Sequence, residues 1–369
     1  MKKINILASL LLGLTLFTAC DDDRTSNPTF QQPTTFVLNT PAYATAVYDL
    51  EKSASVELTC SQPDYGFTAP TIYTAQVSLT NDFSTDGAYL TLPSTYTSAK
   101  MNVSASEIAR AATNLALSNG KAEDEFPITT KLYVRLKAAL TDGKGEIYSN
   151  AIALDNVRVY FALDPVVLPA TMNIIGDDLG DANPVEMVPV NGNAGMFWHI
   201  VYVPAGGKLK FNIAKTYDGG EFGTSATLVD NATAGLSGDG DIVVANAGWY
   251  LVVVKSTIVN RDINYTVEFN KPTVYLLGET VGTWDLLGDN KFTVPADGTS
   301  YFVSPPFQFT KEVRMCVKLG DLDWWRSEFI MFDDGVISYR GAGNDQERYV
   351  GSAGKKVYLN FMTGKGKYE

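Results

Sequence analysis

Residues 208–215 read Lys-Leu-Lys-Phe-Asn-Ile-Ala-Lys, and residues 311–318 read Lys-Glu-Val-Arg-Met-Cys-Val-Lys. In the first run, the apolar residues Leu209, Phe211 and Ile213 alternate with other residues. Successive side chains of a β-strand point to opposite faces of the sheet, so this alternation predicts a strand with one face on a core. The two runs are expected to occupy matching places in two related units.

Three further pairs of segments repeat with a similar spacing. Residues 174–177 match 276–279, residues 196–203 match 300–307, and residues 247–253 match 353–359. The offset grows from 102 residues, between Gly176 and Gly278, to 106 residues, between Gly248 and Gly354, as loop insertions would produce. A period near 100 residues indicates a duplicated domain, and each repeat is predicted to be a small antiparallel β-sandwich.

The part of the chain before these repeats has a different pattern. Alternating runs predict strands at 56–59, 72–79, 132–138 and 156–161. Ser104 and Glu107 have the spacing of a capping box, so residues 104–116 predict a short helix. The run 132–138, followed by a Gly-containing turn and 147–150, is typical of the last strands of an immunoglobulin or fibronectin type III sandwich. We find no aromatic or carboxylate cluster in this part and expect it to act as a spacer.

The chain is therefore predicted to be all-β, with three tandem β-sandwich domains. The expected divisions are a signal peptide at 1–19, a linker at 20–34, an immunoglobulin-like domain at 35–165, and two related sandwiches at 170–270 and 272–369.

Composition excludes several classes of function. The formal net charge of −12 repels phosphate backbones, so we expect no binding to nucleic acid. The single histidine, His199, and three cysteines rule out a His-rich metal cluster and a disulfide framework, and a Ser-His-Asp or Cys-His site would need His199. Cys60 and Cys316 lie in strand-like runs and are predicted to be buried free thiols.

Neither a cofactor nor a bound metal is expected. Asp177-Asp178 and residues 238–241 (Gly-Asp-Gly-Asp) offer carboxylates that can ligate calcium, but they lack the spacing of an EF-hand loop. We favour solvated turns at both places.

The N-terminus has the features of a lipoprotein signal. Lys2-Lys3 precede a short apolar run, and residues 16–20 (Leu-Phe-Thr-Ala-Cys) resemble a lipobox that would leave Cys20 as the lipidated first residue. An ordinary secretory peptide is the alternative. Acyl chains on Cys20 would anchor the protein to a membrane while the rest stays soluble. Residues 21–23 (Asp-Asp-Asp) resemble the acidic surface-export signal of Bacteroidetes lipoproteins, or form a solvated linker.

Tryptophans gather in the loops of the last repeat. Trp284 follows its first predicted strand, and Trp324-Trp325 follow the strand that ends near Lys318. Indoles on surface loops often face solvent, where a flat aromatic ring can stack on the C–H face of a pyranose. The predicted glycan site comprises Trp284, Trp324 and Trp325, the donors Lys318, Arg326 and Arg340, and the acceptor Asp323.

The opposite interpretation is that such indoles cap a sandwich core. We favour it for Trp198 and Trp249, which lie on predicted strands. Neighbours on a strand point to opposite sides, so one of Trp324 and Trp325 is expected in the core and the other toward ligand. The sequence leaves open which one faces ligand.

Two sequence segments in the first predicted domain resemble those of a known family. Residues 30–43 read Phe-Gln-Gln-Pro-Thr-Thr-Phe-Val-Leu-Asn-Thr-Pro-Ala-Tyr, and residues 59–66 read Thr-Cys-Ser-Gln-Pro-Asp-Tyr-Gly. With the lipobox and the tandem sandwiches, they resemble the SusE/SusF outer-membrane lipoproteins of Bacteroidetes polysaccharide-utilisation systems, the three-domain SusE type above all. The resemblance implies a non-catalytic, surface-exposed outer-membrane protein with carbohydrate-binding-module-like sandwiches. It would bind starch-like α-glucan beside a SusC/SusD-type uptake complex.

The resemblance also implies site residues. In that family, paired aromatics and basic side chains form each module's site, which maps onto Trp284, one of Trp324 and Trp325, and the basic residues Lys318 and Arg340. The middle module departs from this pattern, because residues 177–181 carry no aromatic ring. Its second loop offers only Lys215 and Tyr217, so we expect at most a weaker second site there.

Two other classes of function stay open. A glycoside hydrolase needs two carboxylates that flank a cleft, and pairs such as Asp321/Asp323 or Asp333/Asp334 are more typical of solvated turns. A structural or adhesin-like stalk of stacked sandwiches would need no ligand site.

Overall fold

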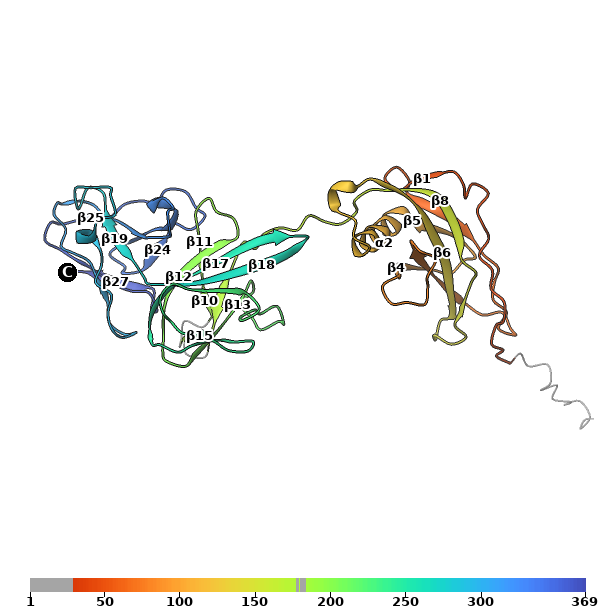
Figure 1. Ribbon diagram of the computed structural model, residues 1–369, viewed down its shortest axis with the longest axis horizontal. Helices are drawn as coiled ribbons and strands as arrows, with labels where there is room; N and C mark the ends of the chain where they lie inside the picture. The colour runs from red at the N-terminus through yellow and green to blue at the C-terminus, as the bar shows by residue number, and fades with distance from the viewer. Residues whose placement is uncertain (1–28, 177–178, 180–183) are drawn as a thin grey trace, which may run out of the picture. The chain divides into compact units, whose positions relative to one another are not determined.

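The computed structural model describes residues 29–176, residue 179 and residues 184–369. The chain divides into two compact units, Met1–Asp164 and Pro165–Glu369 (Figure 1). Among the described residues, no helix has the length and apolar character needed to cross a membrane.

Two hypotheses concern residues outside the ranges that the structure describes. Cys20 and the leader before it lie outside the described residues, and so does Asp177-Asp178. Lipidation of Cys20 and a solvated turn at Asp177-Asp178 therefore stay predictions.

The first unit is built on one six-stranded sheet (Figure 1). Its strands run in the order β1 (Val47–Asp49), β8 (Ile152–Val159), β6 (Ile128–Leu140), β3 (Thr71–Ser78) and β4 (Tyr89–Tyr96), and β7 (Ile147–Tyr148) pairs with β6. The unit also contains a two-stranded sheet, the helix α2 and a 3-10 turn: β2 (Ser55–Thr59) with β5 (Lys100–Ser104), α2 (Ala105–Ser118) and η1 (Glu123–Glu125). The strands predicted at 56–59, 72–79 and 132–138 are confirmed, whereas the one predicted at 156–161 lies earlier, as β8.

Helix α2 begins as predicted. The Ser104 hydroxyl accepts a hydrogen bond from the backbone N–H of Glu107 at 3.4 Å, which caps the helix. The Glu107 carboxylate accepts from the hydroxyl and the amide of Ser94 on β4, at 2.5 and 3.3 Å. It therefore ties the helix to the sheet, while Ile108 and Leu115 fill the space between them.

The expectation that the first unit holds no aromatic cluster is wrong. The guanidinium of Arg135 lies 4.7, 5.4 and 4.3 Å from the ring centroids of Phe83, Tyr89 and Tyr148. These rings come from three separate segments, which only the pairing of the strands brings together, so the sequence pattern did not reveal the cluster.

The second unit begins with a sandwich of two five-stranded sheets. One sheet has the order β10 (Val185–Glu186), β9 (Asn173–Ile175), β13 (Gly207–Asn212), β16 (Ile242–Val244) and β15 (Leu236–Ser237). The other has the order β11 (Val188–Pro189), β12 (Met196–Val203), β17 (Gly248–Val259), β18 (Asp262–Asn270) and β14 (Thr227–Asp230).

The last part of the chain forms smaller sheets. The largest has the order β19 (Val274–Leu277), β22 (Arg314–Val317), β23 (Glu328–Met331) and β24 (Ile337–Tyr339). The others are β20 (Phe302–Val303), β26 (Val357–Asn360) and β27 (Lys365–Tyr368), and the pair β21 (Lys311–Glu312) and β25 (Val350–Gly351). Two 3-10 turns, η3 (Gly288–Asn290) and η4 (Trp324–Ser327), lie in the loops of this last part of the chain. The all-β prediction is confirmed.

The two sandwiches of the second unit share a hydrophobic core. Trp198 is fully buried, and its ring centroid lies 6.4 Å from that of Phe329 in the last sandwich. The ring centroid of the buried Trp249 lies 5.0 Å from that of Phe302, which also belongs to the last sandwich. Both strand tryptophans are therefore core residues, as predicted, and they close the junction between the repeats.

The pairing of strands corrects the repeat alignment by one residue. Ile174 pairs with Phe211 across β9 and β13, and the matching Leu276 pairs with Met315 across β19 and β22. The counterpart of Phe211 is thus Met315 rather than Arg314. The sequence misled us because residues 313 and 315–317 are all buried, so the run at 311–318 lacks a clean alternation.

The thiols and the histidine are buried. Cys60 and Cys316 are free and buried, as predicted, and burial raises the pKa of Cys60 to about 11. His199 is buried against Tyr339, and its Nδ1–H donates to the carbonyl oxygen of Ile200 at 2.9 Å. Burial lowers the pKa of His199 to about 4, and the enclosed ring is not placed to activate a nucleophile.

We expect His199 to make the second unit less stable in acid. The unfolded chain takes up this proton near the ordinary pKa of 6.5, but the folded chain takes it up only near 4. Stability is therefore lost as pH falls through this window, by about 3 kcal/mol from neutral pH to a pH of about 4. Chemical denaturation across this range should show a smaller decrease for His199→Gln. An identical decrease in both proteins would contradict the assignment, because carboxylate effects are common to the two.

Candidate functional site

Two indoles and one guanidinium form an exposed platform on the last sandwich. The ring centroids of Trp284 and Trp324 lie 5.4 Å apart, with an angle of 34° between the ring planes. The Arg314 guanidinium carbon lies 5.3 Å from the Trp284 ring and 5.5 Å from the Trp324 ring. We call these three residues the indole platform. It joins the loop after β19, strand β22 and the turn η4.

A tight turn presents Trp284. The N–H of Gly278 donates to the Thr283 carbonyl at 2.6 Å, and Gly278 has a φ of +82°, which favours glycine. A Cβ atom added at Gly278 would lie 3.3 Å from the Trp284 ring. Trp284 is 50% exposed, so one part of its ring meets the turn and another part meets solvent.

Side chains on the outer face of the sheet support the Trp324 ring. It packs on a small apolar cluster formed by Tyr275, Leu277 and Cys316, which lie on the outer face of the sheet. The Ser327 hydroxyl at the end of η4 donates to the carbonyl of Val317 and fixes the turn to β22. The indole is therefore oriented by side chains that lie outside the main core.

A buried carboxylate anchors the arginine of the platform. Glu328 is 2% exposed and accepts from Arg314 at 3.2 Å and from Arg340 at 3.0 Å. Arg348 forms a third ion pair with the same carboxylate, also at 3.2 Å. A buried charge needs such partners, and this one keeps the Arg314 guanidinium against the two indoles.

Sequence reasoning missed both Arg314 and Glu328. The available signal was the alternation of β22: Met315 and Val317 face the core, which places Arg314 and Cys316 on the outer face with the tryptophan loops.

The structure places Trp325 apart from the platform. Trp324 and Trp325 lie in a 3-10 turn rather than a strand, and both are partly exposed, so the expectation that one enters the core is wrong. The Trp325 ring lies 4.5 Å from the guanidinium of Arg326 and 5.3 Å from that of Arg340. Trp325, Arg326 and Arg340 thus form a second aromatic–cationic group.

The polar residues around Trp325 have structural partners. Arg326 donates to the carbonyl of Asn191, in the preceding sandwich, at 3.0 Å. Its Nε atom lies 3.9 Å from the Asp323 carboxylate, which is otherwise exposed. The bond to Asn191 connects the two sandwiches, whereas the ion pair with Asp323 is local to the loop. Neither contact brings Arg326 or Asp323 to the indole platform.

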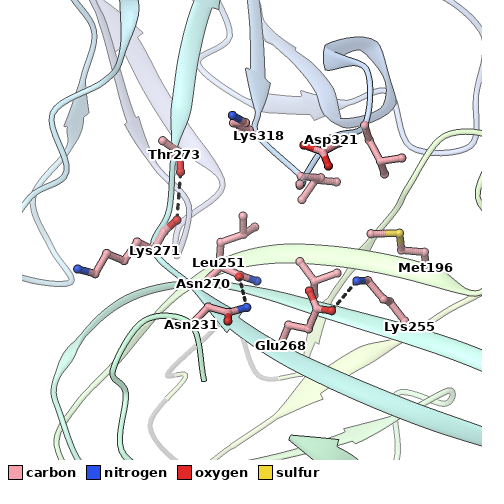
Figure 2. Close-up of a pocket in the computed structure, with 14 residues that line it drawn as sticks. Met196, Asn231, Leu251, Lys255, Glu268, Asn270, Lys271, Thr273, Lys318 and Asp321 are labelled. Atoms are coloured by element: carbon pink, nitrogen blue, oxygen red, sulfur yellow. Dashed lines mark hydrogen bonds and ion pairs between the residues drawn. The ribbon is translucent and has the colours of Figure 1, made fainter. Parts of the chain in front are cut away.

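Lys318 follows Val317, the last residue of β22, whereas Arg314 is the first residue of that strand. At about 3.3 Å per residue along a strand, the two residues are about 13 Å apart. Figure 2 shows Lys318 and Asp321 at one side of a pocket of about 550 Å³, with the Lys255–Glu268 ion pair on the other side. The structure therefore groups Lys318 with the junction of the sandwiches rather than with the indoles.

The middle sandwich has a partial counterpart of the platform. The pairing of β9 and β13 makes Lys210 the equivalent of Arg314. Lys210 lines a cleft of about 230 Å³ together with Tyr217 and Asp241, and its ammonium pairs with the Asp241 carboxylate at 3.2 Å. Tyr217 is 66% exposed. Lys215 instead pairs with Glu186 at 2.6 Å, and the cations that line the cleft with Tyr217 are Lys208 and Lys210.

Comparison with known proteins identifies the family. Residues 171–266 and 273–367 each match the family described as SusF/SusE starch-specific CBMs (carbohydrate-binding modules), and residues 22–137 match the family described as SusE outer membrane protein. The chain belongs to the SusE/SusF family. This membership agrees with the resemblance noted in the sequence and confirms the expected outer-membrane location.

The sequence and the crystal structure of one relative show how far the likeness extends. The outer membrane protein SusF of Bacteroides thetaiotaomicron is 42% identical over 204 residues, which cover 53% of this chain and 41% of that protein. The chain thus spans less than half the length of this relative. The crystal structure of SusF from Bacteroides thetaiotaomicron matches with a TM-score of 0.51 and 24% identity, over 91% of this chain and 99% of that one, and supports the tandem sandwich fold.

We expect Glu328→Ala to destabilise the second unit by about 3–5 kcal/mol, because it leaves three guanidinium groups without their shared buried partner. Denaturant unfolding measures the change. Glu347→Ala, at an exposed position nearby, is the matched control and should stay within about 0.5 kcal/mol of the parent. Equal stability of the two variants would show that Glu328 is not an essential anchor.

Proposed function

We propose that this protein captures starch-like α-glucan at the outer membrane through the indole platform and does not cleave it. The observation that carries the proposal is the indole pair, with Trp284 half exposed and Trp324 partly buried, and with Arg314 beside both rings. Its membership of a family described as starch-specific CBMs supports this ligand class.

The platform has the chemistry that a sugar surface needs. Each indole offers a flat apolar face to the C–H groups of a pyranose, and Arg314 offers N–H donors to hydroxyl oxygens. The angle of 34° between the rings makes the surface curved, which suits a glycan chain that itself curves. Because half of the Trp284 surface is open to solvent, the platform can bind the interior of a chain.

A binding role accounts for the carboxylates better than catalysis does. A glycoside hydrolase places two carboxylates on either side of the scissile bond. The carboxylate behind the platform, Glu328, is 2% exposed and enclosed by three guanidinium groups, so a substrate oxygen does not reach it. This arrangement supports a non-catalytic binder.

The lipid anchor and the transporter partner remain parts of the proposal. Acylation of Cys20 would hold the protein in the outer membrane, facing the cell exterior, beside a SusC/SusD-type uptake complex. The support is the lipobox-like sequence at 16–20 and the match of residues 22–137 to an outer membrane protein family.

We expect Trp284→Ala to weaken binding to a soluble starch or maltooligosaccharide by more than 1 kcal/mol, or at least about fivefold in Kd, through lost stacking and burial. Isothermal titration calorimetry measures Kd, and the same mixtures should release no reducing ends. Trp325→Ala tests the second aromatic–cationic group, and we expect a smaller effect. Unchanged affinity in folded Trp284→Ala would overturn the site, and steady sugar release would overturn the binding-only role.

The cleft of the middle sandwich should act as a weaker second site. In the Trp284→Ala background, we expect Tyr217→Ala to abolish the residual retardation of the protein in starch-containing native gels, because a second weak contact raises avidity for a polymer. Tyr43→Ala, which removes a 77% exposed tyrosine in the first unit, is the matched control. Equal retardation of the two double variants would show that Tyr217 does not bind.

A further inference from the structure

The last sandwich contains a second concave site that shares no lining residue with the indole platform. It is a pocket of about 300 Å³ between the segment after β23, strand β25 and strand β27. This volume lies at the lower end of the range for small-molecule sites.

One wall of this pocket is a stacked pair of tyrosines. The ring centroids of Tyr349 and Tyr368 lie 4.1 Å apart, and the ring planes differ by only 12°. The Tyr368 hydroxyl donates to the carbonyl of Met331 at 2.5 Å, and the buried Phe307 packs beside Tyr368 at 6.2 Å. Each ring covers one face of the other, so the pair forms a rigid aromatic wall that is fixed by its own contacts.

The rim of the pocket supplies both hydrogen-bond acceptors and donors. Burial and the neighbouring Asp333 carboxylate raise the pKa of the Tyr349 hydroxyl, and Asp333 itself is exposed. Lys355 and Ser352 also line the pocket and are exposed. A bound molecule would thus meet an anion, a cation and a hydroxyl around one aromatic face.

Close backbone packing keeps the pocket open. A Cβ atom added at Gly351 would lie 2.3 Å from the Phe307 ring, and one at Gly366 would lie 2.1 Å from the Tyr358 carbonyl oxygen. Gly335 has a φ of +70°, and a Cβ atom there would lie 2.7 Å from the Gly366 carbonyl oxygen. Since these walls already touch, the pocket cannot collapse without moving the strands.

This combination of groups selects a class of ligand. Asp333 disfavours an anion and Lys355 disfavours a cation, while an apolar ligand would leave the polar rim desolvated and unpaired. A neutral polyol with a flat C–H face satisfies all of these groups. We propose that the pocket binds one pyranose residue, either a monosaccharide or the end of a glycan chain. It therefore complements the open platform, and its binding does not depend on the platform.

Amide and indole signals can follow the two sites in one experiment. We suggest titrating the full mature ¹⁵N-labelled chain with D-glucose and with maltotriose, observed by NMR. Shifts of the Gly335, Gly351 and Gly366 amides report the pocket, and shifts of the Trp284 and Trp324 indole N–H signals report the platform. We expect both sugars to move the glycine amides, and Asp333→Ala to weaken that response at least fivefold.

The neighbouring carboxylate provides a matched control. Asp334 is exposed, does not line the pocket and accepts from the Val336 amide at 3.0 Å, so Asp334→Ala should leave the glycine response unchanged. Lys355→Met is a second test if Asp333→Ala perturbs the fold.

The outcomes separate the two sites. Glycine amides that stay still while the indoles shift would overturn the pocket and leave the platform. The reverse result would overturn the platform and support the pocket, and a spectrum without any shift would overturn both. A glycine response equal in Asp333→Ala and in the parent would also overturn the pocket.

Discussion

The candidate site depends on the alternation of one short strand. In β22, Met315 and Val317 point into the shared core, so Arg314 and Cys316 must point outward. Cys316 then supports Trp324, while Arg314 reaches both indoles and the buried Glu328. A shift of the register by one residue would bury the guanidinium and remove the floor of the platform at once.

Contacts on the inner face of the same sheet also fix which side chains point outward. Phe329 faces inward beside Glu328, and its ring lies within reach of the fully buried Trp198 of the preceding sandwich. The outer face with the indoles and the inner face at the junction are therefore two faces of the same strands. The sandwiches are joined by a continuous core rather than by a flexible connection, since Trp198 and Trp249 pack directly on the last sandwich.

The sequence was sufficient for the class of fold and the duplication, and it named the two indoles that lie together in the candidate site, because these features depend on local composition and alternation. Trp284 and Trp324 stand in loops beside conspicuous strand runs, which is why they could be named. Arg314 was missed although strand alternation directs it outward, because the consecutive buried residues 315–317 obscure that alternation in the sequence. Lys318 shares the outward parity of Arg314, but strand length puts it near the junction pocket instead. Trp325 was misjudged because the loop forms a 3-10 turn, to which strand alternation does not apply.

The buried Glu328 is better explained by orientation than by stability. Replacing a buried ionic group with apolar side chains of similar volume is often neutral or stabilising, so the cluster of three guanidinium groups adds little that a larger core could not supply. What apolar groups cannot do is fix the direction of Arg314. In the proposed role of a glycan binder, a guanidinium that is already held against the indoles would lose less conformational freedom on binding, and this would matter because each stacking contact is weak. The close-packed junction between the sandwiches also limits motion. It would hold the platform and the Lys210–Tyr217 cleft at a constant separation, which would favour binding of a polymer that can contact both.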